Sequence, residues 1–207
     1  MEEFDIKSIL DKLFTNNKVF NSEADFQLEL AMYIKNKYKD KCKIVLEYCP
    51  GYMKDKNVYI DILVIINNHK YPIELKYKTK EAIEEYDGIK YYLKEHGAKN
   101  INCYLYWNDV KRIEDFKKND KSFKKGYTIF LTNDEIYLKA PRSNASYKEF
   151  SIHPSDDKKC KDLKWQKKSK LKTIHLDGVY YTQSDKNWFT IKSNTKTQFY
   201  YLINEIK

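Results

Sequence analysis

The chain has 207 residues, of which 42% are hydrophobic and 33% are charged, and its formal net charge is +9. This composition is typical of a globular protein with a hydrophobic core and excludes wholesale disorder. No apolar run approaches the roughly 18–20 residues that a membrane span needs. The N-terminal residues also lack a secretion-signal pattern. We therefore expect a cytoplasmic protein with no membrane partner.

The positive charge indicates the kind of partner, and the cysteine pattern indicates the state of the thiols. A basic excess suggests a polyanion, most simply nucleic acid, although the abundance of Lys, Asn, Ile and Tyr would also arise in an AT-rich genome. Only Arg112 and Arg142 are arginines, which argues against extensive bidentate reading of guanine. The four cysteines form no CxxC pair and have no histidine at zinc spacing, so we expect free thiols.

The first half of the chain is predicted to contain two helices followed by strands. Residues 4–14 form a short amphipathic pattern, and residues 21–38 form a longer one with Ser22 as its N-cap. Within this second helix we expect Ala24 and Leu28 to face the sheet. The β-branched and apolar segments that follow predict three strands, over residues 42–52, 57–66 and 69–78.

The second half is predicted to alternate between helices and strands. The pattern favours a helix over residues 81–98, a strand over 101–107, a short helix over 108–119 and a strand over 126–134. Including the helix over 21–38, the order is α, β, β, β, α, β, then a short helix and a strand, which indicates a mixed α/β domain.

The pattern weakens beyond Pro141. A lysine-rich segment over residues 155–172 precedes two predicted short strands and a final strand or helix. We therefore expect a core over residues 1–140. A β-rich, Lys/Tyr-rich C-terminal extension over residues 141–207 is expected to pack on it as one domain.

The stretch YPIELKYKTK carries an acid and a base two residues apart within a predicted strand. A two-residue turn at Asn67-Asn68 would pair residues whose numbers sum to 135, so that Asp61 would face Glu74. Lys76 would share their side of the hairpin. The other side would be core, formed by Ile60, Ile62, Val64, Ile66, Ile73, Leu75 and Tyr77.

Two carboxylates and an ammonium on one face suit phosphodiester hydrolysis. Asp61 and Glu74 would repel one another, and a divalent cation such as Mg²⁺ between their oxygens would remove that repulsion. Lys76 could orient a water or stabilise charge on the phosphorus. The alternative is a solvated acid–base ladder of cross-strand ion pairs, which is common and contributes little.

The segment YIDILVIINNHKYPIELK resembles the motif of the PD-(D/E)XK nuclease superfamily, with Asp61 as the D and Glu74-Leu75-Lys76 as the ExK. The resemblance covers residues 20–134, and Ile60 stands in the place of the motif's proline. It implies the restriction endonuclease-like αβββαβ core, with a mixed central sheet flanked by helices. It further implies a Mg²⁺- or Mn²⁺-dependent endonuclease acting on DNA, with Asp61 and Glu74 as metal ligands and Lys76 as the catalytic lysine.

Further residues are candidates for supporting roles. Many members of this superfamily carry a glutamate on the first helix, for which Glu23 is our choice and Gln27 a secondary contact; Glu23 could equally serve only the helix dipole. Glu47 is a weaker metal-site candidate. Lys78 and Lys80 would contact phosphates or remain solvated. Asn108, Asp109, Arg112 and Glu114 would form either a buried polar network or a substrate contact.

Three readings of the function remain open. The first is the DNA endonuclease. The second is a catalytically inactive or partner-dependent nucleic-acid-binding protein of the same fold. The third is an α/β interaction protein whose acid–base ladder is structural. The sequence does not distinguish DNA from RNA as substrate. A homodimer is conceivable, but nothing in the sequence identifies a self-complementary surface.

Overall fold

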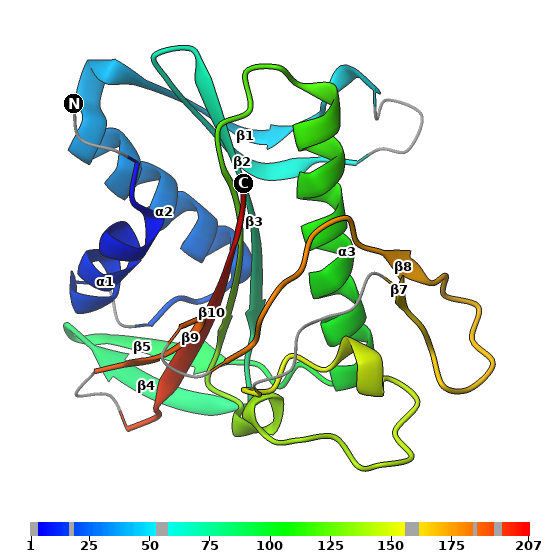
Figure 1. Cartoon of the computed structure of the whole chain (residues 1–207). Coiled ribbons are helices and arrows are strands. Elements are labelled where there is room, and N and C mark those ends of the chain that lie inside the picture. The colour runs from blue at the N-terminus through cyan, green and yellow to red at the C-terminus, as the bar shows by residue number, and fades with distance from the viewer. Residues whose placement is uncertain (1–3, 17–18, 53–57, 156–161, 184–185, 193–195) are drawn as a thin grey trace.

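A computed structural model describes residues 4–16, 19–52, 58–155, 162–183, 186–192 and 196–207. Within these residues the protein is a mixed α/β structure built on a six-stranded mixed sheet. Helices α1 (Ile6–Asn16) and α2 (Glu23–Tyr38) cover one face of the sheet, and α3 (Lys99–Asn119) covers the other (Figure 1).

The central sheet joins strands from both ends of the chain. Its order is β1-β2-β3-β6-β10-β9, and β3 is parallel to β6 while the other neighbours are antiparallel. The strands are β1 (Cys42–Tyr48), β2 (Ile60–Ile66), β3 (His69–Lys78), β6 (Gly126–Thr132), β9 (Trp188–Ile191) and β10 (Phe199–Ile206).

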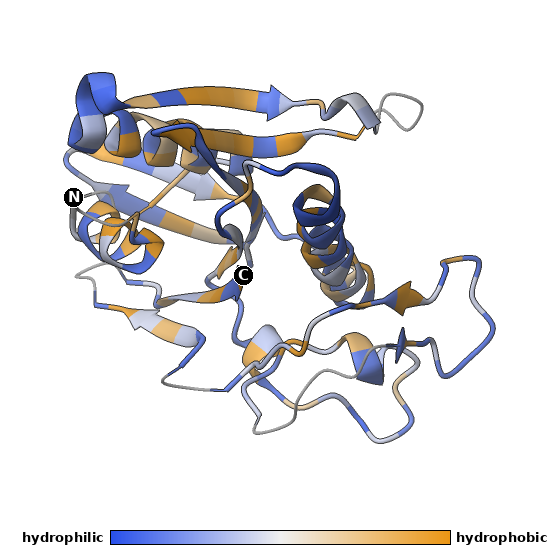
Figure 2. Ribbon diagram, turned by 45° about the horizontal axis from the view of Figure 1, so that its top comes forward, coloured by the Kyte–Doolittle hydropathy of each residue, from blue (hydrophilic) through white to orange (hydrophobic). Residues whose placement is uncertain are grey.

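A hydrophobic cluster lies on each face of the sheet. On one face, Phe26 and Leu30 of α2 share a cluster with buried residues of β3 and β6, and on the other, Trp107 and Ile113 of α3 share a cluster with buried residues of β2, β6 and β10. All four side chains are fully buried. Figure 2 shows the hydrophobic residues running along the strands of the sheet. Because the sheet is covered on both faces, any polar residue on its central strands must find a partner inside the protein.

The first half of the chain largely follows the prediction. The predicted helices correspond to α1 and α2, and the Ser22 hydroxyl accepts a 3.1 Å hydrogen bond from the Asp25 N–H as the N-cap of α2. Three strands follow, although β1 ends at Tyr48 and β2 begins at Ile60; residues 53–57 lie outside the described part of the chain. The pairing of Ile66 with His69 confirms the predicted hairpin register.

The predicted orientation of α2 was wrong. Ala24 is exposed and Leu28 is 49% exposed, whereas Phe26, Leu30 and Ile34 are fully buried. The buried residues follow one another at intervals of four and are larger than alanine, so they bury more apolar area against the sheet.

The helix predicted over residues 81–98 was also wrong. This segment contains a hairpin of β4 (Ala82–Tyr86) and β5 (Ile89–Leu93). Its turn residues Asp87 and Gly88 have φ angles of 52° and 74°. Two consecutive positive φ angles are those of a type I′ turn, for which Asp-Gly is a strong signal.

The strand predicted over residues 101–107 was wrong as well, because it forms the first half of α3. Buried side chains recur along this segment at helical spacing, at Cys103, Tyr106, Trp107, Val110 and Ile113. The predicted helix over 108–119 is the second half of the same helix. The order α-β-β-β-α-β is nevertheless present as α2, β1, β2, β3, α3 and β6, with the β4–β5 hairpin inserted before α3.

The C-terminal residues contribute to the central sheet. Strand β10 pairs with β6 from Tyr200 to Ile206, and β9 pairs with β10 at the sheet edge. A small separate ladder joins β7 (Asp162–Leu163) to β8 (Ile174–His175). Of the predicted lysine-rich segment, residues 156–161 lie outside the described part of the chain.

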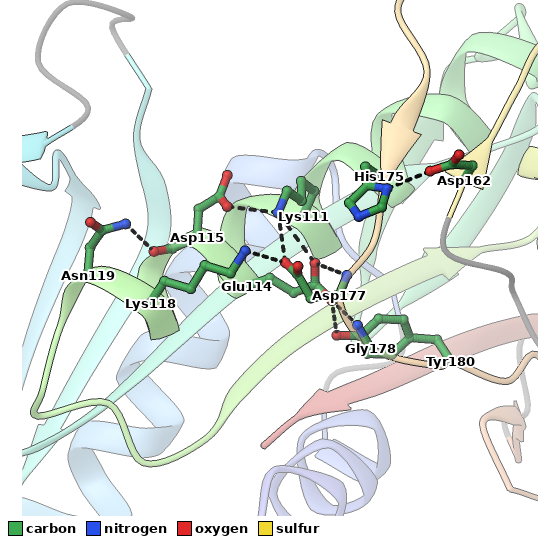
Figure 3. A network of polar contacts seen from close by, with 10 residues as sticks. All are labelled: Lys111, Glu114, Asp115, Lys118, Asn119, Asp162, His175, Asp177, Gly178 and Tyr180. Atoms are coloured by element: carbon green, nitrogen blue, oxygen red, sulfur yellow. Dashed lines mark hydrogen bonds and ion pairs between the residues drawn. The ribbon is translucent and has the colours of Figure 1, made fainter.

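A buried carboxylate ties the C-terminal segment to α3. Glu114, 3% exposed, accepts hydrogen bonds from the backbone N–H groups of Asp177 and Gly178 at 2.7–2.9 Å, and from the Tyr180 hydroxyl at 2.7 Å (Figure 3). Lys111 and Lys118 each lie 2.8 Å from the Asp177 carboxylate. Glu114 therefore has a structural role in this conformation.

No described helix is both long enough and apolar enough to cross a membrane. No disulfide joins the described cysteines Cys42, Cys49 and Cys103, as predicted, and Cys160 lies outside the described residues.

Candidate active site

Strands β2 and β3 separate at the point where the predicted acidic residues stand. Their ladder runs from Ile66↔His69 to Ile62↔Ile73 and stops one residue before Asp61 and Glu74. Beyond that point, a side chain accepts the hydrogen bond of a β3 backbone N–H group: Asp61 Oδ2 accepts a 2.6 Å hydrogen bond from the Leu75 N–H. The separation of the strands therefore creates a position in which a carboxylate is held against the backbone of β3.

We call the place where β2 and β3 separate the β2–β3 fork. Glu23 of α2 occupies the next position along this fork. Its Oε2 accepts a 2.7 Å hydrogen bond from the Tyr77 N–H and lies 2.9 Å from the Lys78 ammonium. Gln27, one turn further along α2, donates from Nε2 to the Asp61 carbonyl and to Glu47 Oε1, both at 2.7 Å. The predicted helix residues therefore both reach the β2–β3 fork, despite the error in the buried stripe of α2.

The face of the hairpin that carries the charges lies beneath α3. Glu74 Oε1 accepts a 2.8 Å hydrogen bond from Arg112, and Lys76 Nζ lies 2.6 Å from Asp109 Oδ2. Arg112 also lies 3.3 Å from Asp109. Glu74 is 1% exposed, so the alternative of a solvated ladder does not hold for this residue. The predicted core face is also interrupted, because Ile60 belongs to the cluster on the α3 side.

Burial dominates the protonation of the two motif carboxylates. Desolvation raises the pKa of Asp61 to about 6, although the nearby Lys76 ammonium opposes the shift. Desolvation also holds the pKa of Glu74 well above its usual range, with further increases from the negative charges of Asp109 and Asp61. The expected repulsion between the two motif acids is therefore present at Glu74.

Lys76 is held as a cation. Burial alone would lower its pKa, but the carboxylates of Asp109 and Glu23 outweigh this effect and raise the pKa above the usual lysine value. Its ammonium also donates a 3.1 Å hydrogen bond to the Leu75 carbonyl. In this arrangement Lys76 can orient a water or stabilise negative charge, but it is poorly suited to accept a proton.

Of the predicted nucleic-acid contacts, Lys78 belongs to the cluster and Lys80 does not. Lys78 pairs with Glu23, as described above. Lys80 is exposed, and its backbone N–H donates a 2.7 Å hydrogen bond to Asn133 Oδ1. Lys80 lines a separate polar cavity of about 770 Å³ beside Asn133 and Asp134.

Sequence reasoning gave Asp109 and Arg112 no place beside the motif residues. The sequence predicts that they form, with Asn108 and Glu114, either a buried polar network or a substrate contact, without a location. The signal was present: Asp109 is a charged residue on the apolar stripe of a helix, between the buried Tyr106 and Val110. A buried charge on such a stripe indicates a partner of opposite sign. Because the sequence pattern predicts a strand and a short helix in place of α3, the burial of Asp109 on this stripe is not evident from the sequence.

The donor atoms at the fork fit a cation held by few protein ligands. In the described part of the chain, no group of three or more His, Cys, Asp and Glu side chains could hold a metal ion. Glu74 Oε2 is nevertheless buried and has no hydrogen-bond partner among the described residues. Mg²⁺ commonly binds through one or two carboxylates and keeps several waters. Asp61 and Glu74 could therefore hold this ion.

The chain matches no family model, and no curated protein or solved structure is significantly similar to it.

Proposed function

We propose that this protein is a Mg²⁺-dependent endonuclease that hydrolyses phosphodiester bonds of DNA, built on a restriction endonuclease-like core. One observation carries the proposal: Asp61, Glu74, Lys76 and Glu23 converge at the fork between β2 and β3. The first three come from the YIDILVIINNHKYPIELK motif and the fourth from the preceding helix, as the resemblance to PD-(D/E)XK nucleases implies.

The architecture supports this assignment. The elements α2, β1, β2, β3, α3 and β6 follow one another in the order of that superfamily core, and they form a mixed sheet with helices on both faces. Element order is a fold-level analogy, so the chemistry must be argued from the side chains at the fork.

Asp61 and Glu74 would hold the metal ion. The unpartnered Oε2 of Glu74 is the donor atom that most needs a cation, because a buried carboxylate oxygen without a partner is costly. When bound, the ion would lower the pKa of a bound water and polarise the phosphoryl group. Arg112 already compensates the other oxygen of Glu74.

Lys76 would act through its charge. Asp109 and the Leu75 carbonyl fix the direction of its ammonium, so the cation is preorganised next to Asp61. A fixed positive charge at such a position stabilises the charge that develops on a phosphate in the transition state. Glu23 would orient a water at the outer side of the fork, where its side chain remains 39% exposed.

The charge of the chain favours a nucleic acid as substrate. A net charge of +9 supports contacts with a phosphate backbone, and lysines supply most of it. With two arginines in the chain, one of them paired with Glu74, direct reading of guanine would be limited. We therefore favour recognition of backbone or shape over an extended base sequence.

A second candidate function is supported by the ion pairs at the site. Lys76 is paired with Asp109 and Glu74 with Arg112, so positive charges already compensate much of the cluster without a metal. Such compensation is what a nucleic-acid-binding protein without catalytic activity would need to keep these charges buried. This candidate retains the fold and the basic surface but makes no cut.

A cleavage assay separates the two candidates. The wild-type protein is incubated with supercoiled plasmid, single-stranded DNA and RNA, each with Mg²⁺, with Mn²⁺ and with EDTA. The nuclease predicts nicking or linearisation of DNA with either ion and none with EDTA. The inactive candidate predicts intact DNA in every sample, together with binding in a mobility-shift assay. Cleavage of RNA alone would retain the chemistry and change the substrate.

A further inference from the structure

Arg112 lies between the two strands that carry the proposed metal ligands. From α3, its Nη1 donates a 2.8 Å hydrogen bond to Glu74 Oε1 of β3. The same atom lies 3.5 Å from the carbonyl of Tyr59, which precedes β2 and stands two residues before Asp61. Burial alone would lower the pKa of Arg112, but the negative charges of Glu74 and Asp109 outweigh this effect, so the guanidinium stays charged. A permanent cation therefore already contacts a carboxylate that a metal ion would need.

Arg112 is the more exposed of the two cations beside Glu74. The Glu74 side chain is 1% exposed and that of Asp109 is 2% exposed, so neither carboxylate can turn to water. Lys76 is 14% exposed and is held by both Asp109 and the Leu75 carbonyl. Arg112 is 21% exposed, and all its contacts with the described residues are made by Nη1. Of these side chains, Arg112 is therefore the one that can move away.

Charge balance supplies a reason for such a movement. A bound metal ion requires ionised ligands. With Asp61, Glu74 and Asp109 ionised, this part of the site holds three negative charges. Lys76 and Arg112 supply two positive charges around Glu74. Binding of a divalent ion would turn the deficit of one positive charge into an excess of one. Because buried charges need compensation, the excess favours release of the Arg112 guanidinium towards solvent.

We propose that Arg112 competes with a divalent cation for Glu74, so that it neutralises this carboxylate until an ion binds and then gives way. The inference rests on the metal site of the proposed function. Two cations on one buried carboxylate repel each other, so Arg112 lowers the affinity of the site for the ion. Removing the charge of Arg112 should therefore tighten metal binding. A residue that only supported the fold would weaken metal binding or leave it unchanged when replaced.

Calorimetric titration of the full chain with Mn²⁺, in the absence of nucleic acid, tests the proposal. Arg112→Gln removes the charge but keeps a donor for Glu74, and it should lower the dissociation constant of Mn²⁺ by at least about tenfold. Adding Glu74→Gln to this variant should abolish the gain. Lys111→Gln is the matched control, because it removes a positive charge from the preceding position of α3. Lys111 pairs with Asp177 of the C-terminal segment at 2.8 Å, so its variant should bind Mn²⁺ like the wild type.

NMR of the arginine side chains keeps the test informative if Arg112→Gln fails to fold. The chain contains two arginines, Arg112 and the exposed Arg142. Arg142→Lys removes one of the two Nε–H signals and thereby assigns the other. Addition of Mg²⁺ to the wild type should shift the Arg112 signal and speed its exchange with water. The Arg142 signal should stay unchanged.

Three results would overturn the proposal. One is an unchanged or weaker affinity for Mn²⁺ in a folded Arg112→Gln variant. Another is an Arg112 signal that Mg²⁺ does not move. The last is a lack of metal binding by both the wild type and Arg112→Gln.

These measurements are separate from the cleavage assay. A protein that shows the expected gain in Mn²⁺ affinity but cuts no DNA would contradict the nuclease and support the role of Arg112. A protein that cuts DNA, but whose Arg112→Gln variant binds Mn²⁺ no more tightly, would support the nuclease and contradict this role.

Discussion

The Lys76 ammonium lies 2.6 Å from the Asp109 carboxylate, which joins β3 of the central sheet to α3. Only 14% of the Lys76 side chain and 2% of the Asp109 side chain are exposed. A pair of this kind is costly to break because the remaining charge stays buried without a partner. It therefore fixes both the position of α3 and the charged state of Lys76.

Replacing Asp109 should destabilise the protein more than replacing an exposed acid of the same helix. We expect Asp109→Ala to lower the free energy of unfolding by about 3 kcal/mol, because Lys76 and Arg112 lose a buried carboxylate. Asp115→Ala is the matched control. Asp115 pairs with Lys111 at 2.9 Å but is 40% exposed, so its loss should cost less than about 1 kcal/mol. Urea denaturation measures both, and equal losses would contradict the role of Asp109.

Asp61→Asn should stabilise the metal-free protein at alkaline pH. The folded protein raises the pKa of Asp61 from 3.8 to about 6, so it binds more protons than the unfolded chain between these values. Stability therefore falls as the pH rises through this window, and the penalty is fully present above it. The variant should gain about 2–3 kcal/mol over the wild type at pH 8 and little at pH 4.

Urea denaturation in EDTA at the two pH values measures this difference. Asp25→Asn, at the beginning of α2, serves as a comparison, because its carboxylate caps the Asn21 N–H outside the cluster. It should show no stabilisation at pH 8. A gain for Asp61→Asn that was the same at pH 4 and pH 8 would contradict the buried-charge explanation.

Removal of the Glu114 carboxylate should loosen the C-terminal segment from α3. Glu114→Ala leaves the N–H groups of Asp177 and Gly178 and the Tyr180 hydroxyl without their acceptor. We expect a loss of about 3 kcal/mol, since each lost hydrogen bond to a charged group costs about 1.5–3 kcal/mol and relaxation recovers part of this. Amide hydrogen exchange should increase around residues 174–180. Unchanged exchange there would contradict the anchoring role.

The part of the fold that local sequence patterns specify was predicted well. A two-residue turn at Asn67-Asn68, where both φ angles are positive, fixes the β2–β3 register because a one-residue slip would turn every side chain to the other face. The candidate site followed from this register, since Asp61, Glu74 and Lys76 all stand on the two strands of this hairpin.

The errors arose where two kinds of structure share similar local patterns. Residues 81–98 contain apolar residues at intervals that suit a helix, but Asp87-Gly88 favours a type I′ hairpin turn and prevailed. Residues 101–107 are rich in β-formers, yet burial of Cys103, Tyr106 and Trp107 against the sheet selects a helix. Tertiary packing decides the secondary structure of such segments.

The contacts of Asp109 and Arg112 could not be predicted without the correct α3. Their partners stand on β3, more than 30 residues away in sequence. Only the docking of a continuous helix over β3 brings these residues together. The position of β1 at the edge of the sheet could not be predicted either, because it depends on the strand order across the sheet.

The central claim is that the Lys76 cation takes part in phosphodiester hydrolysis. The most direct test is the rate of plasmid nicking in Mg²⁺ by the wild type, Lys76→Ala and Lys70→Ala. Lys70 stands on the same strand and pairs with Asp120 at 2.6 Å, but it lies outside the site, so its variant controls for the loss of an ion pair on β3. We predict a loss of at least about a hundredfold for Lys76→Ala, the scale of removing one transition-state charge contact, and near wild-type nicking for Lys70→Ala. Equal nicking by the wild type and a folded Lys76→Ala would contradict the account.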